Sequence, residues 1–346
     1  MGSSPLVQLT LTRFREFFRE PEALFWVFIF PVLLAAGLGI AFGNRPPPIT
    51  RVAVVSGAPD AHRVAQALRV DSSLRVETLD DSAAALALRT GRIALLVVPA
   101  GDGTVEYRYD NTRPEGQTAR LLVDNALQRG AGRPNLVATR DRLIRERGAR
   151  YIDFVVPGIL GMNIMGSGIW GIGFPVVEAR RKKLLKRLIA TPMRRYQYLL
   201  SFLLSRLTML VLEVVILVGF GALAFGVPLR GSAAGLVLTC LLASLAFGSM
   251  GLLIASRVTT IEGASGLMNL VMLPMWIFSG VFFSSANFPD AFQPFIQALP
   301  LTAAIDAFRA SMLEGAGLGA LLPELANLGT WLVLSFVVAV RIFRWR

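Results

Sequence analysis

The sequence predicts an all-α polytopic membrane protein into which an extracytoplasmic α/β domain is inserted. Of its 346 residues, 54% are hydrophobic and 17% are charged, a balance more apolar than that of most soluble proteins. Six stretches contain the roughly 20 apolar residues that a helix needs to cross a hydrocarbon core about 30 Å thick. A polar insert separates the first two, so the chain divides into residues 1–43, 44–150 and 151–346.

The transmembrane helices are predicted from the apolar runs alone. They cover residues 23–43, 152–177, 199–227, 233–255, 264–284 and 325–343. The first run is interpreted as a retained anchor and not as a cleaved signal peptide. It carries Pro31, exceeds the usual apolar h-region and lacks a clear small-x-small cleavage site.

An amphipathic helix is predicted before the first span. Leu11, Phe14 and Phe18 recur at roughly helical spacing, while Arg15 and Arg19 take the other side. Helices of this kind lie in the headgroup plane of a membrane. A frayed polar tail is the alternative interpretation.

The polar insert alternates strand and helix patterns after the stiff Pro46-Pro47-Pro48 run. Strands are predicted at residues 52–55, 74–78, 93–98 and 105–109, and helices at 61–69, 83–89 and 117–129. This alternation is typical of a small α/β domain. The pair Asp80-Asp81 is expected to cap the helix that follows it. The insert contains no glycine-rich phosphate loop and no catalytic set of residues.

Basic residues predict the orientation of the chain. The net charge of +12 would also suit nucleic acid, but basic residues beside spans more often record membrane topology. With both termini in the cytoplasm, the short inner segments hold fifteen basic residues, and the short outer connections hold only Arg230 and Arg309. We therefore expect a multi-pass protein of the cell (inner, cytoplasmic) membrane whose partners include the lipid bilayer but no nucleic acid.

Metal and redox chemistry are not expected. The chain has one histidine, His62, and one cysteine, Cys240. These exclude a His-based metal site and an intramolecular disulfide. No catalytic, cofactor-binding or metal-binding residue is predicted.

The third span carries two ionisable residues. Arg206 and Glu213 are seven apart, and therefore on nearly the same face of a helix. Such residues usually face a bundle interior and mark either a transport pathway or a structural pair. Alternatively, Arg206 lies near enough to the cytoplasmic end to extend toward the headgroups. Glu213 needs an internal partner, and a structural hydrogen bond is favoured.

Residues 288–312 are too polar to cross a membrane alone and contain three prolines, including Pro300. They predict a re-entrant or surface hairpin before the last span, lying against a cavity or a dimer partner. Asp306 and Arg309 are three apart within it and are expected to pair on one helix face.

The richest motif is the basic stretch between the second and third spans. Leu184, Leu185, Leu188 and Ile189 form an apolar stripe, and most basic residues stay outside it. This predicts a short surface helix that stops at Thr191-Pro192, because the residue before a proline avoids α geometry. A simple anchor to anionic lipid is the alternative.

The chain resembles the membrane subunits, or permeases, of ABC-2 type transporters with a large external domain between the first two spans. The resemblance rests on four pieces in order: residues 19–26 (REPEALFW), 153–158 (DFVVPG), 178–195, and Pro300-Leu-Thr with Asp306-Ala-Phe-Arg309. Where many members have a glycine-threonine pair after the acidic residue, this chain has the basic run 180–183.

The resemblance implies a coupling helix near residues 178–195 that docks on a separate ATP-hydrolysing subunit, which would bind ATP and Mg. It implies a second permease, either a copy or a paralogue. The residues assigned to coupling are Glu178, Arg180, Arg181, Lys183, Lys186, Arg187, Thr191 and Pro192.

Two functions are considered. The first is the permease subunit of an ATP-driven exporter of a drug-like, lipid or other amphiphilic substrate. The second is a membrane receptor or signalling module that senses a ligand through the external domain. The lysines lie only at 182, 183 and 186, and none follows a glycine-rich loop, so the chain has no Walker A motif. It is therefore not expected to be the ATPase. Because His62 alone cannot supply a paired nucleophile and base, the chain is not expected to be an enzyme.

Overall fold

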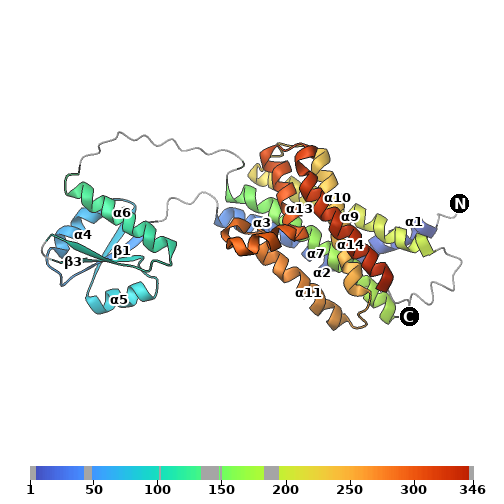
Figure 1. Cartoon of the computed structure of the whole chain (residues 1–346), viewed down its shortest axis with the longest axis horizontal. Helices are drawn as coiled ribbons and strands as arrows, with labels where there is room; N and C mark the ends of the chain where they lie inside the picture. Colours follow the sequence, from blue (N-terminus) through green and yellow to red (C-terminus); the bar gives the residue numbers. More distant parts are fainter. Residues whose placement is uncertain are drawn as a thin grey trace. The chain divides into compact units, whose positions relative to one another are not determined.

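The computed structural model describes residues 5–42, 49–100, 103–133, 148, 150–182 and 195–342. The chain folds as two compact units. One comprises Met1–Gly43 together with Ile144–Arg346, and the other comprises Asn44–Leu143 (Figure 1). Each unit is described by itself.

The smaller unit is built on a four-stranded sheet in the order β2-β1-β3-β4. Its strands are β1 (Thr50–Val55), β2 (Leu74–Leu79), β3 (Leu95–Pro99) and β4 (Val105–Arg108). β1 pairs in parallel with both β2 and β3, whereas β3 and β4 are antiparallel. The predicted mixture of strands and helices is confirmed, with strand positions shifted by only a few residues.

Helices cover both faces of this sheet (Figure 1). Alternate residues of β1 divide between them: Val52 and Val54 pack with α4 (Ala61–Arg69) and α6 (Pro114–Gly130), whereas Ala53 and Val55 pack with α5 (Asp81–Arg89). This follows from the two-residue period of a strand. Asp80 caps α5 as predicted, because its carboxylate accepts a hydrogen bond from the Ala83 amide.

The larger unit is helical, and six helices among its described residues are long and apolar enough to cross a membrane. The first, Pro21–Ala41, consists of α2 (Pro21–Leu24), the π-helical segment η1 (Phe25–Ile29) and α3 (Phe30–Ala41). The others are Tyr151–Arg181 (α7), Leu204–Phe225 in α9 (Arg195–Phe225), Ala233–Ala255 (α10), Ile261–Phe278 (α11) and Leu318–Ile342, which includes α14 (Leu322–Ile342). Each of the six predicted spans overlaps one of these helices, although most of the predicted bounds differ from the observed ones.

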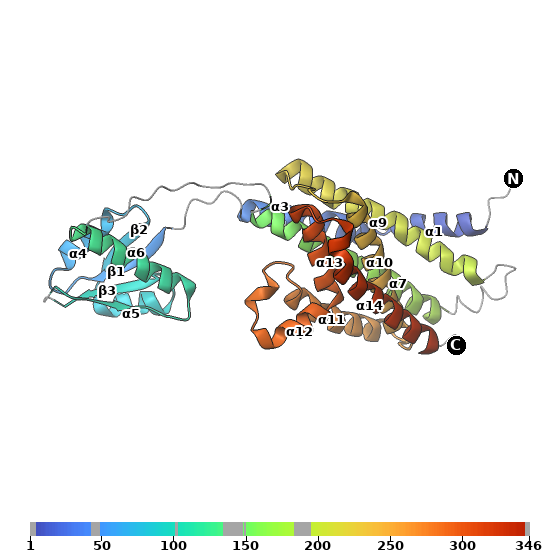
Figure 2. The ribbon, with the colours of Figure 1, turned by 45° about the horizontal axis from the view of Figure 1, so that its top comes forward.

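The N-terminal helix α1 (Pro5–Arg19) packs along α9 (Figures 1 and 2). Val7, Leu11 and Phe18 on this helix remain about half exposed. The predicted helix is therefore present, and its position in the membrane interface stays a prediction.

α7 is the central helix of the larger unit. It packs against α3, α9, α10, α11 and α13 (Pro300–Arg309), and most of its apolar stretch is buried. Two glycines permit close approach of its neighbours. A Cβ atom on Gly158 would lie 2.3 Å from the Val281 carbonyl oxygen, and one on Gly251 of α10 would lie 2.4 Å from the Ile169 carbonyl oxygen of α7. α7 also contains Pro157 and Pro175.

The structure corrects the predicted end of the fifth span. The helix ends at Phe278 and not at residue 284. Gly280 adopts φ +76°, a left-handed conformation that stops a helix and favours glycine. The apolar run continues beyond this point, which is why the sequence pattern alone placed the end too late.

Residues 288–312 form two short helices, α12 (Gln293–Ala298) and α13, which meet at the extended residue Leu299. Pro294 and Pro300 each occupy the first turn of a helix, where a missing amide costs no hydrogen bond. A hairpin of helices therefore precedes the last span, and its re-entrant position in a membrane stays a prediction.

Candidate functional site

A cluster of polar side chains lies in the middle of the helical bundle. Arg206 Nη1 donates a 2.7 Å hydrogen bond to Glu213 Oε1 within α9. The same guanidinium reaches two other helices, since Nη2 lies 2.9 Å from Ser167 Oγ of α7 and Nε lies 3.1 Å from Ser244 Oγ of α10. Only 9% of the Arg206 side chain and 1% of the Glu213 side chain are exposed. The structure therefore brings together the two ionisable residues singled out in the third span.

Ser167 closes this cluster. Its hydroxyl lies 2.8 Å from Glu213 Oε2 and 2.7 Å from the backbone carbonyl oxygen of Asn163. A buried charge pair is favourable only when its remaining hydrogen-bonding atoms are also satisfied. Here both Glu213 oxygens have partners within hydrogen-bond distance, and the cluster joins α7, α9 and α10 into one body.

Asn163 extends the polar contacts to the first span. Its side-chain amide donates a 3.1 Å hydrogen bond to the Val27 carbonyl oxygen. Val27 lies in η1 (Phe25–Ile29), where the helix follows a π pattern. A π segment departs from the regular α ladder and often marks a functional position. Val27 is therefore held by a side chain of the central helix.

A second cluster lies where α7 begins. Asp153 is fully buried, and it accepts hydrogen bonds from Arg150 Nε at 2.9 Å, Arg150 Nη2 at 2.8 Å and the Gly148 amide at 2.8 Å. Arg150 Nη2 also donates to the Phe225 carbonyl oxygen at 2.8 Å. Arg150 therefore links the start of α7 to the end of α9.

The hairpin residues gather at this same end of the bundle. The Arg309 guanidinium lies 3.6 Å from the centre of the Phe154 ring and donates to the Gly280 carbonyl oxygen. Asp306 Oδ1 is 3.8 Å from Arg309 Nη1, so the two residues pair across one helical turn. Pro300 begins α13 and is buried. Arg309 thus fixes the loop after α11 against α7.

The first residues of the predicted coupling segment lie at the opposite end of α7. Glu178 Oε1 pairs with Lys182 Nζ at 2.7 Å, and Arg181 is exposed. The Arg180 guanidinium instead turns toward the end of α10, where it donates hydrogen bonds to backbone carbonyl oxygens. The remaining residues assigned to coupling, Lys183, Lys186, Arg187, Thr191 and Pro192, lie outside the described residues.

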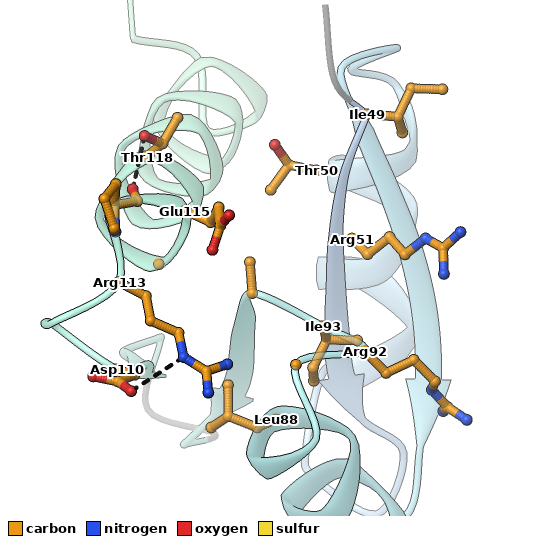
Figure 3. A pocket seen from close by; sticks show the side chains of 14 residues that line it. Ile49, Thr50, Arg51, Leu88, Arg92, Ile93, Asp110, Arg113, Glu115 and Thr118 are labelled. Carbon is orange, nitrogen blue, oxygen red and sulfur yellow. Dashed lines mark hydrogen bonds and ion pairs between the residues drawn. The ribbon is translucent and has the colours of Figure 1, made fainter. Parts of the chain in front are cut away.

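The smaller unit carries an open pocket of about 420 Å³ (Figure 3). It is lined by the first residues of β1, the turn before β3 and the start of α6. Arg113 is held there by Asp110 at 3.4 Å. Open parallel α/β sheets bind ligands beyond the carboxyl ends of their strands, whereas this pocket adjoins the amino ends of β1 and β3. Its position therefore does not match the usual ligand site of such sheets.

Metal binding finds no support among the residues that the structure describes. Within that part of the chain, no three His, Cys, Asp or Glu side chains come together in a way that could hold a metal ion. Cys240 is buried in α10.

Several residues of these clusters were missed by sequence reasoning. Asn163, Ser167 and Ser244 are single polar residues within apolar runs. The sequence gives one indication of their role: an unpaired polar side chain is costly to bury in a helical bundle. This indicates that each has a partner, but it does not identify the partner.

Comparison with known proteins agrees with this architecture. The family described as "ABC-2 family transporter protein" matches residues 21–341. ABC transporter G family member 20 of Dictyostelium discoideum is 30% identical over 172 residues, which are 49% of this chain and 23% of that protein. Nodulation protein J of Bradyrhizobium diazoefficiens is 27% identical over 204 residues, or 58% of this chain and 77% of that protein.

The chain therefore spans less than a quarter of the length of the first relative and most of the second. The family match covers both units, including all six candidate spans in whole or in large part. Permeases of this family lack the ATPase domain and pair with ABC ATPase subunits. The chain belongs to the ABC-2 family of transporter proteins and is a membrane permease subunit.

Proposed function

We propose that this permease couples ATP hydrolysis by a separate subunit to the export of an amphiphilic substrate, such as a lipid or a drug-like molecule. The partner subunit binds ATP and Mg, and the segment near residues 178–195 docks on it. Two permeases, either identical copies or paralogues, surround the substrate path. Both chain termini lie in the cytoplasm, and the sheet-containing unit lies on the opposite side of the cell membrane.

The observation that carries this proposal is the continuity of α7. It runs without interruption for 31 residues, from Tyr151 to Arg181, and is therefore about 46 Å long at 1.5 Å per residue. This exceeds a hydrocarbon core of about 30 Å, so the helix reaches beyond the core toward the basic segment. A displacement of that segment by the ATPase would move the central helix of the bundle.

The arrangement of the bundle supports a change between two packings. The polar clusters and the close glycine contacts join α7 to its neighbours along its length. Packed cores of this kind switch between discrete arrangements and do not deform continuously. Movement of α7 is thus expected to carry the bundle between inward-open and outward-open states.

Charge reversal tests the docking role. The triple variant K183E/K186E/R187E should reduce co-purification of the cognate ATPase at least about tenfold, since 1.4 kcal/mol of lost interaction corresponds to a factor of ten. ATPase activity stimulated by the permease should fall in parallel. The measurement is pull-down of the co-expressed ATPase in detergent, followed by phosphate release.

The matched control is R69E/R75E/R89E, which changes the charge of the smaller unit by the same amount at three exposed positions. This control should bind the ATPase normally. Unchanged binding by the coupling variant would contradict the docking role. Uptake of a fluorescent amphiphile into inverted vesicles that contain both subunits tests export itself.

A further inference from the structure

We propose that Arg180 does not contact the ATPase, but is a positioning residue that ties the coupling segment to the inner ends of α10 and α11. The proposal rests on the docking role of residues 178–195 proposed above. It assigns to Arg180 a mechanical task inside the permease, distinct from that of the basic residues that follow it.

One guanidinium holds three backbone carbonyl groups. Arg180 Nη1 lies 2.9 Å from the Ala255 oxygen and 2.9 Å from the Val258 oxygen, and Nη2 lies 3.2 Å from the Ser256 oxygen. Ala255 is the last residue of α10. The last carbonyls of a helix have no intrahelical partner, and a cation is favourable there because of the helix dipole.

The same contact fixes the start of α11. Only five residues, Ser256 to Thr260, connect α10 to α11. Thr260 then caps α11, because its hydroxyl oxygen accepts a hydrogen bond from the Gly263 amide. Arg180 thus holds the connection at Ser256 and Val258, and the cap formed by Thr260 joins its last residue to α11. The loop has little freedom to move independently of α7.

The neighbouring charges of α7 point elsewhere. Glu178 and Lys182 pair with each other along the helix, and Arg181 and Lys182 are exposed. Arg180 is only partly exposed, and its guanidinium donates to carbonyl acceptors at the end of α10 and in the loop after it. At the end of α7, the charges of Glu178, Arg181 and Lys182 are thus available to a partner, whereas Arg180 turns toward α10.

Close packing precedes this contact along both helices. A Cβ atom on Gly173 of α7 would lie 3.0 Å from the Gly251 carbonyl oxygen of α10. Val177 and Ala255 are fully buried. The two helices are therefore in contact one to two turns before Arg180, and the guanidinium extends this contact to their ends. When the coupling segment moves, α7, the end of α10 and the start of α11 are expected to move as one body.

The test reports on the loop and on partner binding separately. In the full-length chain with Cys240→Ser, a spin label is placed at Thr259→Cys, an exposed loop position. Its spectrum is recorded with the cognate ATPase before and after trapping with ATP and vanadate. R180Q and R180K are compared with R341Q, the matched loss of one exposed arginine charge at the end of α14, outside the coupling segment.

With Arg180 present, trapping should change the spectrum, and R341Q should give the same change as the unsubstituted chain. R180Q should keep ATPase co-purification within about twofold but show a spectral change at least about fivefold smaller. R180K should give an intermediate response, because a lysine has one point charge and lacks the planar fork of arginine. If R180Q does not fold, a response of R180K below that of R341Q supports the proposal, and an equal response overturns it.

Two further outcomes overturn the inference. A full spectral response in R180Q would show that the loop moves without this contact. A loss of ATPase co-purification in R180Q, like that expected for K183E/K186E/R187E, would make Arg180 a partner contact. Failure of the proposed function itself is distinguishable, since the ATPase would then bind neither the unsubstituted chain nor R341Q.

Discussion

Replacement of Glu213 with leucine is expected to destabilise the helical bundle by about 3 to 5 kcal/mol, because it leaves a buried guanidinium without its carboxylate. Arg206 is 9% exposed and cannot reach water without repacking α9. The measurement is thermal unfolding of the full-length chain in detergent, monitored by the near-ultraviolet signal of its tryptophans. Loss of the folded fraction on size exclusion gives a second readout.

The double variant R206M/E213L provides the sharper comparison. Replacing both members of a buried pair with apolar residues of similar size is often neutral, so this variant should recover most of the lost stability. S244A is the matched control, because it removes one neutral partner of Arg206 and should cost about 1 kcal/mol. A double variant no more stable than E213L would contradict the assignment of the pair as a mainly structural element.

The second large effect is expected at Gly158. A Cβ atom there would lie 2.3 Å from the Val281 carbonyl oxygen, and this backbone atom cannot rotate away. The variant G158A should therefore push apart α7 and the loop after α11 and cost about 1 to 3 kcal/mol, the range for overpacked cores. Thermal unfolding in detergent measures the loss.

Gly171 is the control on the same helix. Nothing lies within 4 Å of a Cβ atom at this position. Alanine is a better helix former than glycine by about 0.5 to 1 kcal/mol, so G171A should leave stability unchanged or raise it. If G158A and G171A behave alike, the close contact at Gly158 does not limit packing.

The sequence predicted the positions of helices and strands well and the side-chain contacts between them poorly. The helix at residues 61–69 and the span at 233–255 were predicted at the observed bounds. Both are bounded by local signals, and local signals are what a single sequence contains. The end of the fifth span was missed because Gly280 interrupts an otherwise continuous apolar run.

The candidate site also shows that contacts within one helix are predictable from the sequence, whereas contacts between helices are not. The seven-residue spacing of Arg206 and Glu213 predicts a shared helix face, and the structure places the two side chains in contact. Ser167 and Ser244 come from other helices, so their part in the cluster depends on tertiary packing. Arg180 was grouped with the partner-facing basic residues because its position in the run does not reveal that its guanidinium turns to α10.

The prolines of α7 give this helix three mechanically different parts. A proline donates no backbone hydrogen bond and leaves the carbonyl four residues earlier without its helical partner. Pro157 and Pro175 therefore weaken α7 near each of its ends, while its middle is held by Ser167. Bending is easiest at these two points. A tilt imposed on α7 near Pro175 is therefore expected to reach the part before Pro157 at reduced amplitude.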